Sequence, residues 1–232
     1  MGALCGLVVA GWSVAAHGQG DRLENSPRHH EWVDIDAGNG RNVRTFVAYP
    51  EVREPATTVL VIHENKGLTD WVRGVADQLA EAGYLALAPD LLSGTGPDGG
   101  NTDSFPSQDA ATQGIYKLSA DQVMTDLDAV AAYAKSLEAS NKKIAVAGFC
   151  WGGGQSFAYA THNPDLAAAF VFYGSGPREE AAIAIIECPV YGFYGGNDAR
   201  INGQIPTLEQ QMKAAGKTYA PVIYEGAGHG FL

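Results

Sequence analysis

Residues 148–152, Gly-Phe-Cys-Trp-Gly, set a cysteine between two glycines, with one residue on either side of it. The apolar run 144–147 precedes this segment directly. A chain that turns this sharply from strand to helix has no room for side chains two positions from the central residue, which is why glycine is required there. The pattern predicts a nucleophile elbow that lifts Cys150 clear of a sheet. We also expect the dipole of the following helix to favour the Cys150 thiolate.

Apolar periodicity along the rest of the chain alternates between strand and helix. The strands that we expect are a hairpin over 31–36 and 43–49, followed by 58–62, 84–88, 144–147, 166–172, 190–194 and 219–224. The helices that we expect cover 70–82, 119–137, 151–162 and 205–215. This order predicts an α/β fold, with a mostly parallel sheet, helices on both faces and an antiparallel N-terminal hairpin. No composition break divides residues 30–232, so we expect one domain.

Residues 93–114 are rich in Gly, Ser, Asp, Pro and Thr and carry little apolar content. Compact domains rarely keep so long a loop unless it binds something or covers a site. We therefore expect this segment to be a loop that acts as a substrate-shaping lid.

A net charge of −11 excludes the classes of protein that bind nucleic acids or anionic membranes through clustered Lys and Arg. Residues 3–16 are almost purely apolar and are too short for a membrane span. Together with Val-Ala-Ala at 14–16, they indicate what remains of a signal peptide over residues 1–16, although no basic residue precedes the run. This implies a periplasmic or secreted protein without a membrane span in its mature form. A packed N-terminal helix in a cytoplasmic protein is the alternative.

Three residues with catalytic chemistry each follow a strand, in the order Cys150, Asp198, His229. This is the chain order of the nucleophile, acid and histidine of an α/β-hydrolase. Functional residues of parallel sheets gather at the carboxyl ends of the strands, so the three are expected to meet. The alternatives are that Cys150 is a small buried residue, as we expect for Cys188, that Asp198 caps a turn and that His229 lies on the surface.

These segments resemble the dienelactone hydrolase family of α/β-hydrolases, the carboxymethylenebutenolidase-like proteins. The matching pieces are Ile-His-Glu-Asn-Lys-Gly-Leu at 62–68, Ala-Pro-Asp-Leu at 88–91, Gly-Phe-Cys-Trp-Gly-Gly at 148–153, Gly-Gly-Asn-Asp at 195–198 and Gly-His-Gly-Phe at 228–231. The resemblance covers nearly all of the chain from about residue 30 to the end.

The resemblance implies that Cys150 attacks a carbonyl carbon and forms a thioester. His229 would transfer the proton and later activate water, while Asp198 would fix the tautomer of its ring.

The resemblance also assigns roles to the segment after strand 58–62. Glu64 would hydrogen-bond the resting thiol and take its proton when substrate arrives; the alternative is a solvated carboxylate at a strand end. The backbone N–H groups of Trp151 and Asn65 would form an oxyanion hole.

Family members that cleave dienelactone bind its carboxylate with two arginines, and this chain departs from the family in both regions. The first region reads Leu-Ser-Gly at 92–94, and the second falls beyond Leu232. Arg200 is the candidate substitute, and dienelactone itself is not the expected substrate. The family's closing C-terminal helix also falls beyond Leu232, so we expect this sequence to lack it.

We therefore expect a cysteine-dependent hydrolase of small activated carboxylic esters or lactones, as a monomer or small homo-oligomer. The alternatives are the same site acting on phosphotriesters or acyl thioesters, and a non-catalytic ligand-binding protein on this scaffold. No cofactor or metal is expected, because residues 152–154 lack the Walker lysine and His63-Glu64 lacks the second histidine of a zinc motif. We interpret His29 and His30 as solvent-exposed.

Overall fold

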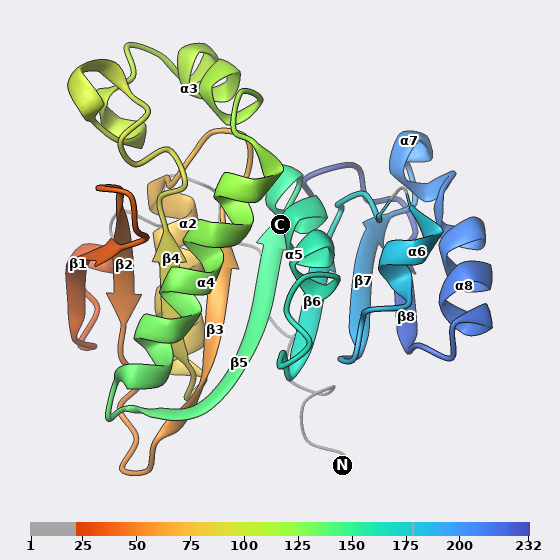
Figure 1. The fold of residues 1–232 in the computed structure, drawn as a ribbon, viewed down its shortest axis with the longest axis horizontal. Helices are drawn as coiled ribbons and strands as arrows, with labels where there is room; N and C mark the ends of the chain where they lie inside the picture. The colour runs from red at the N-terminus through yellow and green to blue at the C-terminus, as the bar shows by residue number, and fades with distance from the viewer. Residues whose placement is uncertain (1–21, 178) are drawn as a thin grey trace.

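An eight-stranded sheet in the order β1-β2-β4-β3-β5-β6-β7-β8 runs through the computed structural model (Figure 1). The structure describes residues 22–177 and 179–232, so the predicted signal segment lies outside the described residues. β1 pairs antiparallel with β2, and β2 antiparallel with β4, while every later pairing is parallel. The predicted α/β class and N-terminal hairpin are confirmed. The strands are β1 (His30–Asp36), β2 (Asn42–Ala48), β3 (Ala56–Ile62), β4 (Leu85–Pro89), β5 (Ser140–Phe149), β6 (Ala168–Phe172), β7 (Val190–Gly195) and β8 (Tyr219–Tyr224).

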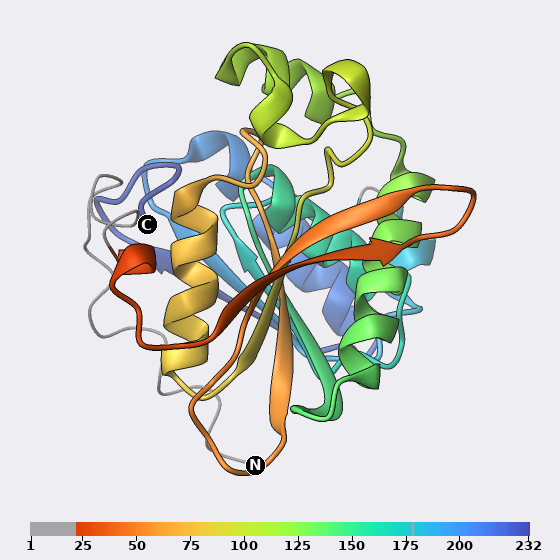
Figure 2. The same ribbon diagram turned by 90° about the vertical axis from the view of Figure 1, so that its left-hand side faces the viewer.

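Helices cover both faces of the sheet, as Figure 2 shows with α2 on one side and α4 on the other. The apolar side of α2 packs against one face, and α4, α5 and α8 pack against the other. The helices are α2 (Asp70–Glu81), η1 (Pro97–Gly99), η2 (Thr102–Ser104), α3 (Gln108–Ile115), α4 (Ala120–Ser136), α5 (Trp151–Ala160), α6 (Glu180–Ile183), α7 (Ala199–Asn202) and α8 (Ile205–Ala214). In the described ranges, no helix combines the length and apolar character needed to cross a membrane.

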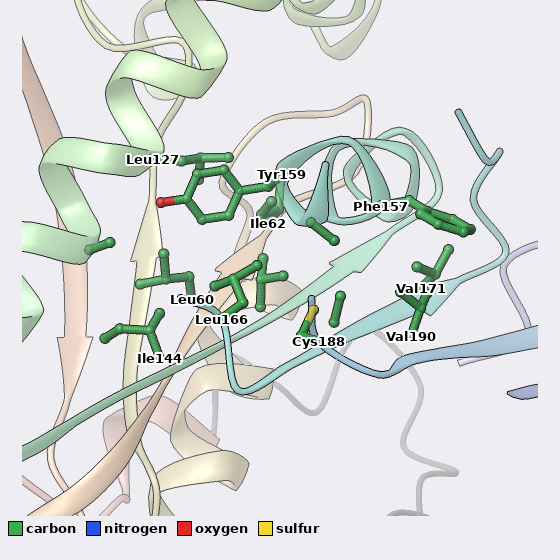
Figure 3. Close-up of a cluster of buried hydrophobic side chains, with 14 of the residues drawn as sticks. Leu60, Ile62, Leu127, Ile144, Phe157, Tyr159, Leu166, Val171, Cys188 and Val190 are labelled. Atoms are coloured by element: carbon green, nitrogen blue, oxygen red, sulfur yellow. The ribbon is translucent and has the colours of Figure 1, made fainter. Parts of the chain in front are cut away.

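The larger core lies between the sheet and the layer of α4, α5 and α8 (Figure 3). Residues 59–62 of β3 and 144–147 of β5 are continuous apolar runs, because both faces of these central strands are covered there. Leu60 and Val146 are fully buried here, and Cys188 is 5% exposed. Cys188 is therefore the buried apolar residue that the sequence predicts, and burial raises the pKa of its thiol to about 11.

Residues 93–114 are not the irregular loop that their composition predicts. They contain η1, η2 and α3, and the Ser107 side chain caps α3 by accepting from Ala110 N at 3.2 Å. Ala111 and Ile115 of this helix pack with Leu92 in a small separate cluster. Two apolar residues suffice to dock one short helix, which leaves no periodicity for a sequence window to detect.

Other boundaries also shift. β5 begins at Ser140, four residues before the predicted strand, and β6 begins at Ala168 instead of Leu166. The four-residue helices α6 and α7 were not predicted, because single turns carry no periodic signal.

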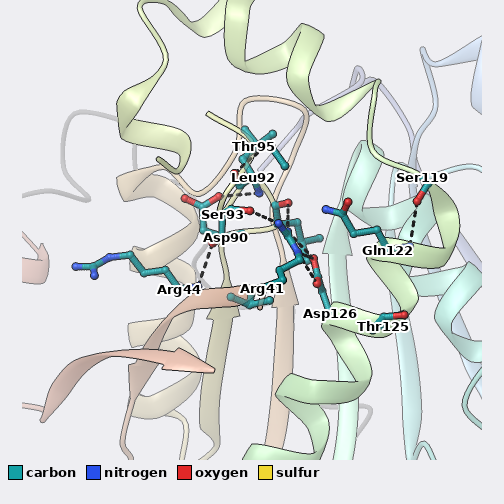
Figure 4. A network of polar contacts seen from close by, with 12 residues as sticks. Arg41, Arg44, Asp90, Leu92, Ser93, Thr95, Ser119, Gln122, Thr125 and Asp126 are labelled. Carbon is teal, nitrogen blue, oxygen red and sulfur yellow. Dashed lines mark hydrogen bonds and ion pairs between the residues drawn. The ribbon is translucent and has the colours of Figure 1, made fainter. Parts of the chain in front are cut away.

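A polar network fixes the base of residues 93–114 to the sheet (Figure 4). Asp90, which is 3% exposed, accepts from Thr102 N at 2.9 Å and from Thr102 Oγ1 at 2.7 Å. Arg41 binds Asp126 of α4 through Nε at 2.9 Å and donates through Nη2 to the Leu91 carbonyl at 3.2 Å. The hydrogen bonds of Asp90 and Arg41 therefore hold the segment that follows β4 in place.

The N-terminal segment is tied to α2 through Asp77, whose side chain is fully buried. This carboxylate accepts from Arg22 Nε at 2.7 Å, Ser26 Oγ at 2.6 Å, and Arg28 Nε and Nη2 at 2.7 and 2.8 Å. His30 Nε2 lies 2.9 Å from the same carboxylate. The expectation of an exposed His30 was wrong, because its partner on α2 is 47 residues away in the sequence.

Candidate active site

The turn between β5 and α5 has the geometry that its glycines predict. Cys150 occupies it with φ 53° and ψ −113°, a conformation that is uncommon for a residue with a side chain. A Cβ on Gly148 would lie 1.9 Å from the Gly152 carbonyl oxygen. A Cβ on Gly152 would lie 2.3 Å from the His63 carbonyl oxygen. Neither position can carry a side chain, so the backbone closes around Cys150.

The structure brings the three predicted residues together at the carboxyl ends of the strands. His229, in the turn after β8, places Nε2 3.1 Å from Cys150 Sγ. Its Nδ1 lies 2.5 Å from Asp198 Oδ2. Asp198 follows β7, is 7% exposed and also caps α7, where its Oδ1 accepts from Ile201 N at 3.2 Å. Asp198 therefore caps a turn and contacts His229 at the same time, although the sequence offered these two roles as alternatives.

These contacts define where the proton of His229 lies. An ionised carboxylate only accepts, so Nδ1 carries the hydrogen that Asp198 receives. Nε2 then presents its lone pair to the sulfur, and the thiol of Cys150 is the donor. The side chain of His229 is 35% exposed, and its ring meets that of Tyr173 edge-on at 5.1 Å between centroids. The arrangement can accept a proton from the thiol without moving a backbone atom.

The expected resting thiolate is not supported by the surroundings of Cys150. Burial raises the pKa of its thiol, and the nearby charge of Glu64 raises it further. The backbone N–H of Trp151 and the charge of Arg200 act in the opposite direction, but they do not compensate. The raised pKa favours a resting thiol, which needs a base before it can act as a nucleophile.

Glu64 lies directly after β3 and acts on Cys150 through its charge. Burial raises the pKa of its carboxyl, while Lys66, His229 and Tyr173 lower it. The resemblance implied a hydrogen bond from the resting thiol to Glu64; in the structure the thiol contacts His229 instead. A carboxyl with a raised pKa beside a thiol can still exchange a proton with it during a reaction.

Of the two residues expected to supply oxyanion-hole donors, Trp151 lies beside the sulfur. Trp151 is the first residue of α5, and its N–H lies close enough to Sγ to lower the pKa of the thiol. Asn65 follows Glu64 in the loop after β3, and its side chain donates to the Tyr116 hydroxyl at 3.4 Å. Trp151 is therefore part of the elbow, and Asn65 lies two residues after His63, whose carbonyl oxygen lies next to Gly152 of the elbow.

Tyr173 belongs to the same site and was not predicted. It follows β6 with φ 41° and is 1% exposed. Within the described residues its buried hydroxyl has no partner at hydrogen-bond distance, yet it lies close enough to Glu64 to lower the pKa of that carboxyl. Burial, followed by the charges of Glu64 and Cys150, raises the pKa of Tyr173 itself. Its position at a strand end was the available signal, but an aromatic residue there is also ordinary core.

A cleft of about 670 Å³ opens beside Glu64 and the turn that carries His229. Leu68 and Trp71 line one side, and Thr102, Phe105 and Gln108 from the segment over residues 93–114 line the other. Arg200, the candidate for binding a substrate carboxylate, is exposed on α7 and, like Cys150 and His229, is not among the residues that line this cleft. Its charge nevertheless lowers the pKa of Cys150. Lys66 is a basic residue that lines the cleft.

His63, next to Glu64, is engaged through both of its ring nitrogens. Both ring nitrogens of His63 are occupied, Nδ1 by the Glu64 carbonyl at 2.7 Å and Nε2 by Leu91 N at 3.2 Å. Among residues 22–177 and 179–232, no group of three or more His, Cys, Asp and Glu side chains is arranged to hold an ion.

Comparison with known proteins identifies a family. The model of the "Dienelactone hydrolase family" matches residues 43–232. Proteins named "Putative carboxymethylenebutenolidase" are 34% identical over 200 residues in Methylorubrum extorquens and 34% identical over 205 residues in Yersinia pestis. The first match covers 82% of this chain and 68% of the relative, and the second covers 83% and 75%.

Solved structures agree with the sequence relatives. The "Putative Dienelactone Hydrolase" from Klebsiella pneumoniae superposes with a TM-score of 0.77 at 30% identity, covering 88% of each chain. The dienelactone hydrolase-like promiscuous phosphotriesterase P91, from metagenomic libraries, has a TM-score of 0.75 at 21% identity, covering 88% of this chain and 84% of its own. The second likeness concerns the fold alone.

Proposed function

The chain belongs to the dienelactone hydrolase family, and on this premise we propose that it is a cysteine-dependent hydrolase of small activated carboxylic esters or lactones. One observation carries the proposal: His229 bridges Cys150 Sγ at 3.1 Å and Asp198 Oδ2 at 2.5 Å. A base within hydrogen-bond reach of a nucleophile, itself oriented by a carboxylate, is the arrangement that covalent acyl transfer requires.

Acylation begins with the thiol proton. His229 Nε2 takes it while the sulfur forms a bond to the carbonyl carbon, and the carbonyl π electrons move to oxygen. The N–H groups of Trp151 and Asn65 stabilise that oxyanion. When the tetrahedral intermediate collapses, the bond to the leaving oxygen breaks and that oxygen takes the proton from the imidazolium. The acyl group is then a thioester on Cys150.

Deacylation repeats the same steps with water. His229 removes a proton from water as the oxygen attacks the thioester carbon, and the same two N–H groups hold the second oxyanion. Collapse expels the sulfur, which recovers a proton from the imidazolium. Asp198 remains ionised throughout and stabilises the positive ring in both steps.

The nucleophile also limits the substrate. A thiolate leaves as readily as it attacks, so the tetrahedral intermediate proceeds to products only when the other leaving group is also good. Enol lactones and aryl esters meet this condition, and ordinary amides do not. The cleft of about 670 Å³ has room for such small molecules.

The segment over residues 93–114 forms one wall of that cleft and is proposed as a substrate-shaping lid. Replacing it with a short Gly-Ser linker is expected to change kcat/KM and the preference between small and bulky aryl esters. Unchanged preference would contradict the lid assignment.

The main test measures p-nitrophenyl acetate hydrolysis by the wild type, Cys150→Ala and Cys188→Ala. Only Cys150→Ala is expected to lose the activity, because Cys188 is buried 38 positions away in the core. Mass spectrometry of the intact wild type, quenched during turnover, should show one acyl group, on the peptide that contains Cys150. Equal rates for the wild type and Cys150→Ala would contradict the proposal.

A phosphotriester is the second candidate substrate. It is supported by the fold shared with P91, whose name describes a promiscuous phosphotriesterase. A panel that pairs each aryl acetate with the diethyl phosphate of the same phenol separates the two, because the leaving group is then identical. Faster Cys150-dependent release from the phosphates would favour the second candidate.

A further inference from the structure

His63 lies between β3 and the candidate site, and its contacts define its protonation state. The residue is fully buried. Nδ1 lies 2.7 Å from the Glu64 carbonyl oxygen, which only accepts, so Nδ1 carries a hydrogen. Nε2 lies 3.2 Å from Leu91 N, whose N–H only donates, so Nε2 presents its lone pair. Both contacts select the same neutral tautomer, and burial, which lowers the pKa of His63, keeps the ring uncharged.

The carbonyl that His63 holds belongs to the peptide that joins Glu64 to Asn65. This peptide is trans, since the described residues contain no cis peptide bond. In a planar trans peptide the C=O and N–H bonds point in opposite directions. Fixing the Glu64 oxygen therefore fixes the direction of the Asn65 N–H. Gly67 N, which donates to the same oxygen at 3.3 Å, closes the turn around it.

The same imidazole contacts the second donor residue. Its ring stacks on the indole of Trp151, with 5.6 Å between centroids and 16° between planes. Trp151 and Asn65 come from different strand ends, 86 positions apart in the sequence. His63 thus holds one donor peptide by a hydrogen bond and packs against the other donor residue.

We infer that His63 is a positioning residue, which keeps the Asn65 N–H directed at the oxygen of the tetrahedral intermediates. The inference rests on the proposed function and adds to it the group that fixes the oxyanion hole. His63 touches neither the nucleophile nor the substrate in this account. Its hydrogen bond prevents the peptide between Glu64 and Asn65 from turning its oxygen toward the site.

Two substitutions separate the two ring nitrogens. In His63→Asn, the amide nitrogen takes the place of Nδ1 and keeps the donor to Glu64, while the acceptor for Leu91 is lost. In His63→Gln, the amide oxygen can take the place of Nε2 and keep that acceptor, while the donor to Glu64 is lost. Both variants lose the stacking on Trp151, so each controls for the other.

The inference predicts that His63→Gln loses kcat on p-nitrophenyl acetate by about 10- to 100-fold relative to His63→Asn, with KM changed less than threefold. Removing an oxyanion-hole donor outright lowers kcat by about 10²- to 10³-fold, and we expect a misdirected donor to lose part of that stabilisation. Thioester formation and thioester hydrolysis should slow together, because both pass through an oxyanion. A purely structural role would instead lower the active fraction of both variants, which active-site titration with iodoacetamide measures.

Equal kcat values for the two variants would overturn the inference and leave the proposed function intact. Absence of Cys150-dependent hydrolysis in the wild type would overturn both. If neither variant folds, the ¹⁵N chemical shifts of the wild-type imidazole decide the matter. Hydrogen on Nδ1 alone supports the inference, and hydrogen on Nε2 overturns it.

Discussion

Two buried carboxylates, Asp77 and Asp198, each contact a histidine, but their surroundings differ in charge. Asp77 accepts from two arginines, a serine and His30. Asp198 accepts from one backbone N–H and from His229. The partners of Asp77 hold the N-terminal segment to α2. At Asp198, the second ring nitrogen of the bound His229 contacts the Cys150 sulfur instead.

The comparison shows what distinguishes a structural ion cluster from a site that can do chemistry. Burial alone would raise the pKa of Asp77, but hydrogen bonds from Arg28, Ser26 and His30 outweigh it and hold the pKa well below its usual range. Such a cluster stabilises the ionised carboxylate of Asp77, so it is not suited to proton transfer. At His229, a single carboxylate orients the ring and the exchangeable position faces a thiol.

The largest expected effect is that of Asp198→Asn on activity. If the amide oxygen still accepts from Ile201 N, the amide NH₂ faces Nδ1 of His229. The ring must then carry its hydrogen on Nε2, which prevents it from accepting the thiol proton. We expect kcat to fall by about 10⁴, the loss typical of a wrong tautomer.

Thermal unfolding is the control for this variant. Because the cap of α7 is kept, the Tm of Asp198→Asn should stay within a few degrees of that of the wild type. A kcat within tenfold of the wild type would show that Asp198 does not set the tautomer.

Asp77→Ala should have the opposite profile. Removing this carboxylate leaves Arg22 and Arg28 without their shared partner, and breaking a buried ion cluster costs about 3–5 kcal/mol in the free energy of unfolding. Because none of the hydrogen bonds of this cluster involves Cys150, Asp198 or His229, kcat per folded molecule should be unchanged. Urea denaturation and active-site titration measure the two quantities, and a loss of kcat without a loss of stability would reverse the assignment.

The third expectation concerns pH. The folded-state pKa of Asp77 is lowered from an unfolded value of about 3.9, so its stabilisation is complete above that value and is lost as the pH falls toward the folded pKa. The free energy of unfolding of the wild type should therefore decline below about pH 4. Asp77→Asn should show a shallower decline over the same range. Parallel curves would indicate that other carboxylates dominate the acid limb.

The smallest effect is expected for Tyr173→Phe. Burial raises the pKa of Glu64, and the Tyr173 hydroxyl is one of the groups that lower it. Removing that hydroxyl should raise the pKa of Glu64 further and move a limb of kcat/KM that follows Glu64 to higher pH. The shift should be less than about one unit, since one unit corresponds to about 1.4 kcal/mol and the hydroxyl has no hydrogen-bond partner among the described residues. Tyr194→Phe, which removes a buried hydroxyl bonded to Tyr219 instead, is the matched control and should leave the profile unchanged.

The parts of the site that could be predicted from the sequence are those marked by a pattern of neighbouring residues. The glycines around Cys150 and the strand ends before Asp198 and His229 are visible within a few residues, and the fold class follows from the same patterns. Tyr173 could not be identified, because its closeness to Glu64 depends on how β6 and β3 are placed around β5.

The predictions that were wrong also depend on contacts that a short stretch of sequence does not contain. The helix dipole at Cys150 can be inferred from sequence, whereas burial and the charge of Glu64, which raise the pKa of its thiol, come from the tertiary structure. The partners of Asp77 lie 47 to 55 positions away, so no sequence window contains the cluster. Helix α3 is docked by too few apolar residues to produce a period.

The elbow also bears on exchanging the nucleophile that we propose for this site. Its two glycines are fixed by contacts with neighbouring backbone, while the unusual dihedral angles belong to Cys150 alone. A residue of similar size at this position inherits the same scaffold, including the histidine on one side and the helix on the other. Cys150→Ser therefore replaces a single atom on a turn whose backbone is fixed by its glycines.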